Sequence, residues 1–75
     1  MKEFELEFRV LDGGWGYSGT WRFRHVNTSE AEMFVHDGLL PYLRRKIEGA
    51  VAIYPSKLCE ISENRVLLKD YYYGR

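Results

Sequence analysis

The chain has 75 residues, of which 45% are hydrophobic and 16% aromatic, and its 11 basic and 11 acidic residues leave no net charge. This length predicts one domain, residues 1–75, and the neutral balance gives no overall field to attract nucleic acid or an anionic membrane. The single cysteine excludes an internal disulfide and a thiolate metal cluster. The start MKEFELEF lacks the apolar stretch of a signal peptide, and no apolar run reaches the ~20 residues of a membrane span, so we expect a cytoplasmic protein.

The first predicted elements are two strands, residues 3–11 and 20–26. The segment EFELEFRVL alternates apolar and charged residues, and TWRFRHV repeats the alternation. A period of two is typical of strands that bury one face. The acidic row of the first strand therefore belongs to the outer face, and its members are candidate contacts for a binding partner: Glu3, Glu5 and Glu7.

The register of these strands is predicted by matching both faces. With a turn across residues 12–19, Phe8 lies opposite Phe23 and Val10 lies opposite Trp21, so that Trp21 becomes a core residue. The same register joins opposite charges on the outer face: Glu7 and Arg24.

The glycine-rich segment GGWGYSG, residues 13–19, has the spacing G-x-G-x-x-G of phosphate-binding loops. In dinucleotide-binding folds a helix follows the third glycine, whereas a strand follows here. In kinases the loop lies between strands, but VAIY has Tyr54 where the kinase lysine stands, and a catalytic loop is missing. We therefore predict a structural hairpin loop and no cofactor. Its aromatic residues, Trp15 and Tyr17, are candidate partner contacts if they do not fold back over the core.

A helical region is predicted next. Ser29 and Glu32 form a capping box, which marks a helix start. Gly38 and Pro41 interrupt the apolar periodicity, and a proline would kink a continuous helix. We therefore predict two short segments, residues 29–37 and 41–48.

The last third of the chain predicts two or three more strands, at residues 50–54, 57–61 and 65–69, with a turn at Pro55-Ser56. The element order is β-β-α-β-β(-β). It indicates an α+β fold with an antiparallel sheet of four to five strands, and a kinked or two-segment helical layer on one face. Cys59 is expected to be a small core residue.

Other candidate binding residues lie late in the chain. Three consecutive tyrosines cannot all face one core, so at least one is expected to contact a partner, unless residues 71–75 form a frayed tail. These are Tyr71, Tyr72 and Tyr73. The basic run RRK complements a helix C-terminus, but with later cations it would form an alternative nucleic-acid patch. The members of that patch are Arg44, Arg45, Lys46, Lys69 and Arg75.

The sequence lacks a recognisable catalytic or metal-binding set. His25 and His36 are the only histidines, and no nucleophile, second carboxylate or ligand cluster stands at a recognisable spacing. We therefore predict that the protein is not an enzyme and holds no metal ion.

These observations favour a small non-enzymatic binding protein that docks on, and occludes or modulates, a larger protein or ribonucleoprotein complex. In size and architecture the chain resembles small phage-encoded inhibitors of host defence, including anti-CRISPR proteins; the resemblance concerns this general type and is not carried by a motif. Two alternatives stay open. One is a small nucleic-acid-binding domain, and the other is a homodimeric accessory subunit that pairs through an exposed strand edge.

Overall fold

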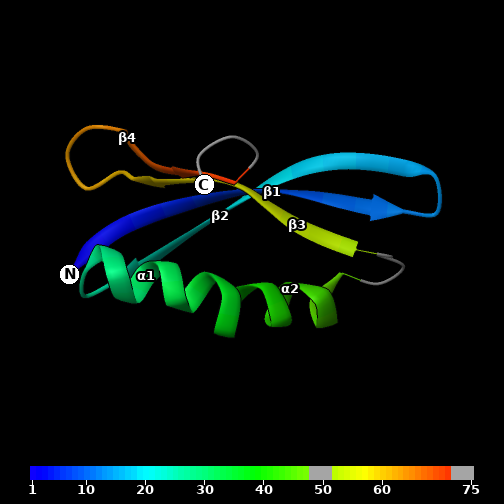
Figure 1. The fold of residues 1–75 in the computed structure, drawn as a ribbon, viewed down its shortest axis with the longest axis horizontal. Helices are drawn as coiled ribbons and strands as arrows, with labels where there is room; N and C mark the ends of the chain where they lie inside the picture. Colours follow the sequence, from blue (N-terminus) through cyan, green and yellow to red (C-terminus); the bar gives the residue numbers. More distant parts are fainter. Residues whose placement is uncertain (48–51, 72–75) are drawn as a thin grey trace.

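The computed structural model describes residues 1–47 and 52–71 as an α+β fold (Figure 1). Four antiparallel strands form one sheet in the order β2-β1-β3-β4, and a helical layer covers one of its faces. In chain order the elements are β1 (Lys2–Asp12), β2 (Trp15–His25), α1 (Thr28–Phe34), η1 (Val35–Leu39), α2 (Leu40–Lys46), β3 (Ala52–Glu60) and β4 (Val66–Asp70). The predicted fold class is confirmed, and the sheet has four strands within the described part of the chain.

The hairpin of β1 and β2 is longer and tighter than predicted. A two-residue turn joins the strands at Gly13 and Gly14, whose φ angles of 57° and 112° favour glycine. The predicted loop over residues 12–19 is therefore wrong, because most of it is strand. Phe4, rather than Phe8, lies opposite Phe23. The predicted register is wrong by this offset, but an even shift leaves every side chain on its predicted face.

The helical layer starts earlier than predicted and is not interrupted. Asn27 is the N-cap, and its Oδ1 accepts a hydrogen bond of 2.8 Å from the backbone N–H of Glu30. The predicted cap at Ser29 is therefore wrong. Helical structure continues from residue 28 to residue 46, so the two predicted segments are one run.

The π-helical segment η1 explains how this run tolerates Pro41. Leu40 donates its backbone N–H to Val35, five residues earlier, so the turn before the proline is wider than an α-helical turn. A proline in a regular helix clashes with the carbonyl four residues before it. The wider turn relieves that clash without ending the helix.

Strand β3 passes through Pro55 and Ser56, where a turn was predicted. Its pairing with β1 shifts between Glu7 and Phe8, which lie opposite Lys57 and Pro55 respectively. Ser56 is therefore the extra residue of a β-bulge. A bulge is the position at which a central strand accepts a proline, because the ladder is already interrupted there.

The core lies between the sheet and the helical layer. Its members are Phe4, Leu6, Phe8, Val10, Ala31, Val35, Leu39, Leu40, Leu43, Ile53 and Leu58. Two predicted core residues differ from this set. Trp21 faces the helical layer, but it belongs to the edge strand β2 and is 37% exposed, with its ring edge-on to Tyr42 at 5.7 Å. Cys59 is buried, as predicted for a small core residue, but it lies opposite Glu5 on the other face of the sheet, outside this cluster.

None of the helices in the described ranges is both long enough and apolar enough to span a membrane.

Candidate functional site

Among the described residues, no helix covers the face of the sheet opposite the helical layer. We call it the uncovered face. Its central row consists of the odd-numbered residues of β1, and the strand registers place residues of β2 and β3 beside them. The row contains Glu3, Glu5, Glu7, Arg9 and Leu11.

The ionic end of the uncovered face is organised around Glu5. This side chain accepts hydrogen bonds from Arg65 Nη1 at 2.6 Å and from Arg22 Nε at 3.0 Å. Glu5 is only 7% exposed, although it belongs to the face opposite the helical layer. The hydrogen bond from Arg65, and then that from Arg22, hold the pKa of Glu5 below its ordinary value. Glu5 is therefore an ionised part of the structure.

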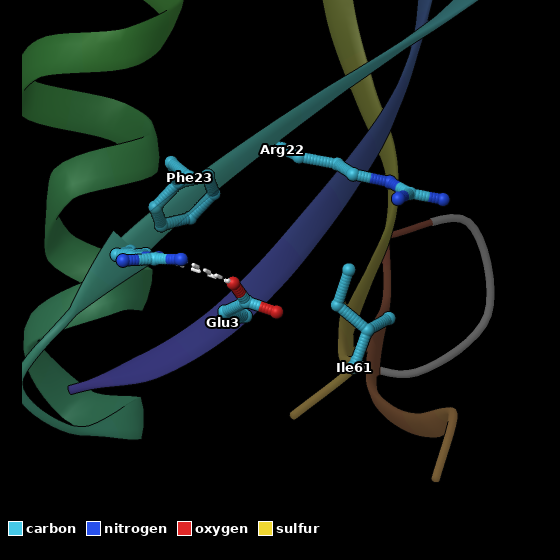
Figure 2. A pocket seen from close by; sticks show the side chains of 5 residues that line it. Glu3, Arg22, Phe23 and Ile61 are labelled. Carbon is cyan, nitrogen blue, oxygen red and sulfur yellow. Dashed lines mark hydrogen bonds and ion pairs between the residues drawn. The ribbon is translucent and has the colours of Figure 1, made fainter. Parts of the chain in front are cut away.

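A second ion pair continues this end of the face. Arg24 Nε donates to Glu3 Oε2 at 3.1 Å, and Figure 2 shows Glu3 in the pocket that it forms with Arg22, Phe23 and Ile61. Two of the three predicted acidic contacts are thus matched by arginines of the same chain. The acidic row does not present an uncompensated line of negative charge.

The other end of the uncovered face is apolar and aromatic. Tyr54 lies opposite Arg9 in the register of β1 and β3 and is 51% exposed, and Leu11 is also exposed. The Arg9 guanidinium extends over Gly16, where a Cβ atom would be 3.0 Å from Nη2. Its Nη1 lies 3.5 Å from Ser18 Oγ. This end therefore combines a cation with exposed apolar surface.

Sequence reasoning missed Arg9 and Tyr54 as candidate binding residues. Arg9 continues the alternation of the acidic row, and this alternation predicts that it lies on the same face of the sheet as the glutamates. Tyr54 becomes its neighbour only through the pairing of β1 with β3, which are separated by the whole helical region. No local pattern specifies that register, because a bulge shifts it.

The predicted aromatic contacts of the hairpin are exposed. Trp15 is 80% exposed and Tyr17 is 48% exposed. They lie opposite Asp12 and Val10, which places both on the side of the sheet that faces the helical layer. In Figure 1 this end of the hairpin extends past the end of α2. Both residues thus belong to a different surface from the acidic row.

The predicted tyrosine cluster is described only at its first residue. The Tyr71 ring is half-buried, edge-on to His36 at 5.6 Å, with Lys69 Nζ 5.1 Å from its centre. Burial, followed by the charge of Glu32, raises the pKa of Tyr71. Tyr72 and Tyr73 lie outside the described residues.

The predicted basic patch is divided between two places. Lys69 Nζ lies 3.9 Å from Glu32 in α1, whereas Arg44 in α2 donates to the carbonyl of Ile53 at 3.3 Å. With a rise of 1.5 Å per residue, Glu32 and Arg44 are roughly 18 Å apart along the helix. The run of Arg44, Arg45 and Lys46 therefore stands apart from Lys69. Arg75 lies outside the described residues.

The histidines and carboxylates do not gather into a metal site within residues 1–47 and 52–71, where no group of three or more potential ligands is found. His25 Nδ1 accepts from the backbone N–H of Val26 at 3.0 Å, and its ring packs against Phe34. These contacts give His25 a structural position at the sheet edge.

No protein family, curated protein or solved structure matches the chain.

Proposed function

We propose that the protein is a non-enzymatic binding protein that docks on a larger protein through the uncovered face of its sheet. The supporting observation is the division of this face into an ionic end and an apolar end with a cation. At the apolar end, Tyr54 and Leu11 provide area that a partner would bury, and Arg9 lies beside them. Exposed aromatic and arginine side chains are the residue types that contribute most to protein interfaces.

The charge of the face favours a particular partner chemistry. Arg22, Arg24 and Arg65 are matched by glutamates, whereas the hydrogen bond of Arg9 goes to a serine hydroxyl at 3.5 Å. An acidic side chain that adjoins an apolar one would complement Arg9 and Tyr54 together. The partner surface that we propose therefore carries both.

The same pairing argues against nucleic acid as the partner. Binding through phosphates requires several cations that can exchange their counterions, and the arginines held by Glu3 and Glu5 are already compensated. The described members of the alternative basic patch lie in two places. A protein surface is thus the better-supported partner.

The narrower hypothesis is that the protein occludes a working surface of its partner, as phage-encoded inhibitors of host defence such as anti-CRISPR proteins do. It rests on the small size of the chain and on the absence of a recognisable catalytic set in its sequence. The identity of a captured partner tests it directly.

The experiment is affinity capture from the native host, followed by mass spectrometry of the captured proteins. We expect Arg9→Ala and Tyr54→Ala to abolish capture while circular dichroism stays unchanged. Arg45→Ala is the matched control, because it removes an exposed arginine from α2 and should retain capture. Capture that survives both face variants would contradict the proposed surface. Salt-sensitive oligonucleotide binding that requires Arg44 and Arg45 would favour the nucleic-acid alternative.

A further inference from the structure

The outer edge of β2 is an open strand edge. Among the described residues β2 pairs only with β1. The N–H of Glu3 donates to Ser62 and its carbonyl accepts from Ile61, so the odd-numbered residues of β1 direct their backbone groups toward β3. The even-numbered residues of β1 then bond β2, and it is the even-numbered residues of β2 whose backbone groups point to the free edge. These are Gly16, Ser18, Thr20, Arg22 and Arg24.

We infer that this edge pairs with the same edge of a second copy, antiparallel, about a two-fold axis at Thr20. Thr20 is the middle residue of β2, so this register uses the full strand. It places Arg22 opposite Ser18 of the second copy and Arg24 opposite Gly16. An axis at Arg22 would instead set two arginines directly against each other, which is destabilising.

In the same register, the side chains of β2 that lie on the covered face of one copy are complementary to those of the second copy. Trp21 lies opposite Gly19 of the second copy, and the Phe8 ring of that copy lies over this glycine, so that two aromatic side chains meet. Phe23 lies opposite Tyr17, and His25 lies opposite Trp15. The aromatic residues of β2 that the single chain leaves exposed are thus brought against the second copy. Their exposure has a common explanation in this pairing.

A pocket beside His25 suits the Trp15 side chain of the second copy. It lies between the end of β2 and the helical layer and is lined by His25, Glu30, Met33, Phe34, Asp37 and Gly38. The Phe34 and His25 rings and the exposed Met33 offer apolar contact. The two carboxylates offer acceptors for the indole N–H. The two-fold axis repeats this contact in both directions.

The charged side chains at the contact between the two β2 strands are largely compensated within each copy. Arg22 is paired with Glu5, and Arg24 with Glu3. Arg9 reaches over Gly16 and is the cation nearest to Arg24 of the second copy. Added salt screens this repulsion. The dimer should therefore be slightly stronger at high salt, the opposite of binding through phosphates.

This inference goes beyond the proposed docking function. A two-fold axis perpendicular to the sheet joins the two sheets edge to edge and puts both helical layers on one side. Both uncovered faces then lie together on the other side and stay accessible. Failure of the dimer would leave the capture experiment on Arg9 and Tyr54 unaffected, so the two proposals fail separately.

Sedimentation equilibrium of the full chain tests the dimer, with Thr20→Pro and Thr20→Ala as a matched pair. The backbone N–H of Thr20 points to the free edge, so a proline there removes a bond of the dimer but none of the ladder with β1. We expect a dimer for the wild type and for Thr20→Ala, and a folded monomer for Thr20→Pro. A wild-type protein that is monomeric at every concentration would overturn the inference.

A cross-linking experiment tests the register. In a Cys59→Ser background, Thr20→Cys places two thiols opposite each other with Cα atoms roughly 5.5 Å apart, within disulfide range. In Ser18→Cys the two thiols lie about 13 Å apart along the strands, so no disulfide can form. We expect mild oxidation to link the first variant and not the second. Linking of Ser18→Cys, or no linking of Thr20→Cys, would overturn this register.

The contact of Trp15 with the second copy is tested by Trp15→Ala. We expect the dissociation constant of the dimer to rise about tenfold or more, with an unchanged circular dichroism spectrum. Leu67→Ala is the control, since it removes another exposed apolar side chain from β4, at the opposite edge of the sheet. An unchanged dissociation constant for Trp15→Ala would show that the pocket beside His25 does not hold this residue.

Discussion

The two faces of β1 reach burial by different means. On the covered face, Phe4 and Leu6 are enclosed by apolar side chains of the helical layer and of neighbouring strands. On the uncovered face no described helix lies above Glu5, yet its exposure of 7% is close to the 5% of Phe8. Arg22 of β2 and Arg65, which directly precedes β4, cover this carboxylate.

This difference shows that the exposed fraction of a side chain does not by itself determine how much the side chain contributes to stability. Burial of an apolar side chain stabilises the fold by removing apolar area from water, and it does not depend on one specific partner. A covered carboxylate is stabilised only while its arginines stay in place. Two side chains with almost equal exposure should therefore differ in the cost of their removal and in their response to pH.

The largest effect is expected for Phe4→Ala on the covered face. Phe4 is fully buried, and its ring stacks on Phe23 with a centroid distance of 5.5 Å. Its truncation should lower the free energy of unfolding by about 3–5 kcal/mol, through lost burial and a cavity. Urea unfolding measures the change. A cooperative transition within about 1 kcal/mol of the wild type would show that the covered face is not the main source of stability.

Trp21→Ala sharpens the comparison within the covered face. Trp21 faces the helical layer from the edge strand, and more than a third of it is exposed. We expect a loss of about 2 kcal/mol, below that for Phe4 despite the larger side chain. The same urea series measures it, at a concentration where the protein is monomeric. A loss as large as that of Phe4→Ala would place Trp21 in the core after all.

Glu5→Gln tests the uncovered face. The free energy of unfolding at neutral pH should fall by about 1–2 kcal/mol, because the hydrogen bonds of Glu5 are charged but the arginines that donate them are solvated. The pKa of Glu5 is lowered in the folded protein from its ordinary value of 4.5, so its stabilisation is complete above that pH. It is lost as the pH falls through the lower, folded pKa.

The measurement for Glu5→Gln is urea unfolding of the wild type and the variant over a range of pH. The difference in the free energy of unfolding between wild type and variant should be constant near neutral pH and should shrink below pH 4.5. A difference that grows on acidification would contradict the ionised state of Glu5.

The smallest effect is expected for Arg24→Ala. Arg24 and Glu3 are both exposed enough to be screened by water, unlike Glu5. The loss should be below about 1 kcal/mol and should vanish at high salt. Thermal unfolding at two salt concentrations measures it. A loss that exceeds that of Glu5→Gln would mean that burial of the carboxylate is not what distinguishes the two pairs.

The faces of the first hairpin could be predicted from the sequence, but its register could not be fixed by alternation alone. Pairing Phe23 with Phe8 or with Phe4 satisfies the same period of two. The turn decides between them, and Gly13-Gly14 between alternating strands is a known signal of a two-residue hairpin. The G-x-G-x-x-G spacing instead favours a longer loop over this segment.

The helix start and the course of β3 show two other limits of local patterns. Asn27 with Glu30 and Ser29 with Glu32 both have the spacing of a capping pair, and in the structure it is Asn27 that accepts the backbone N–H of Glu30. Pro55 is a turn signal in isolation, yet a bulge accommodates it within the sheet.

The candidate site was predictable only where one strand supplies it. The side on which Glu3, Glu5 and Glu7 lie followed from the alternation of β1. The covering of Glu5 by Arg65, and the position of Tyr54 beside Arg9, depend on long-range pairing that no short segment encodes.

The π-helical segment η1 has a consequence for the length of the chain. A π turn is equivalent to an α-helix with one residue inserted, because Val35 bonds Leu40 rather than the residue before it. Removing one residue from this turn would bring Val35 and Leu40 to ordinary helical spacing and leave the buried stripe of the helix in phase. Pro41 would then meet the regular turn whose carbonyl it crowds. Deletion within η1 is therefore compatible with this fold only when that proline is replaced as well, so the extra residue and the proline belong together.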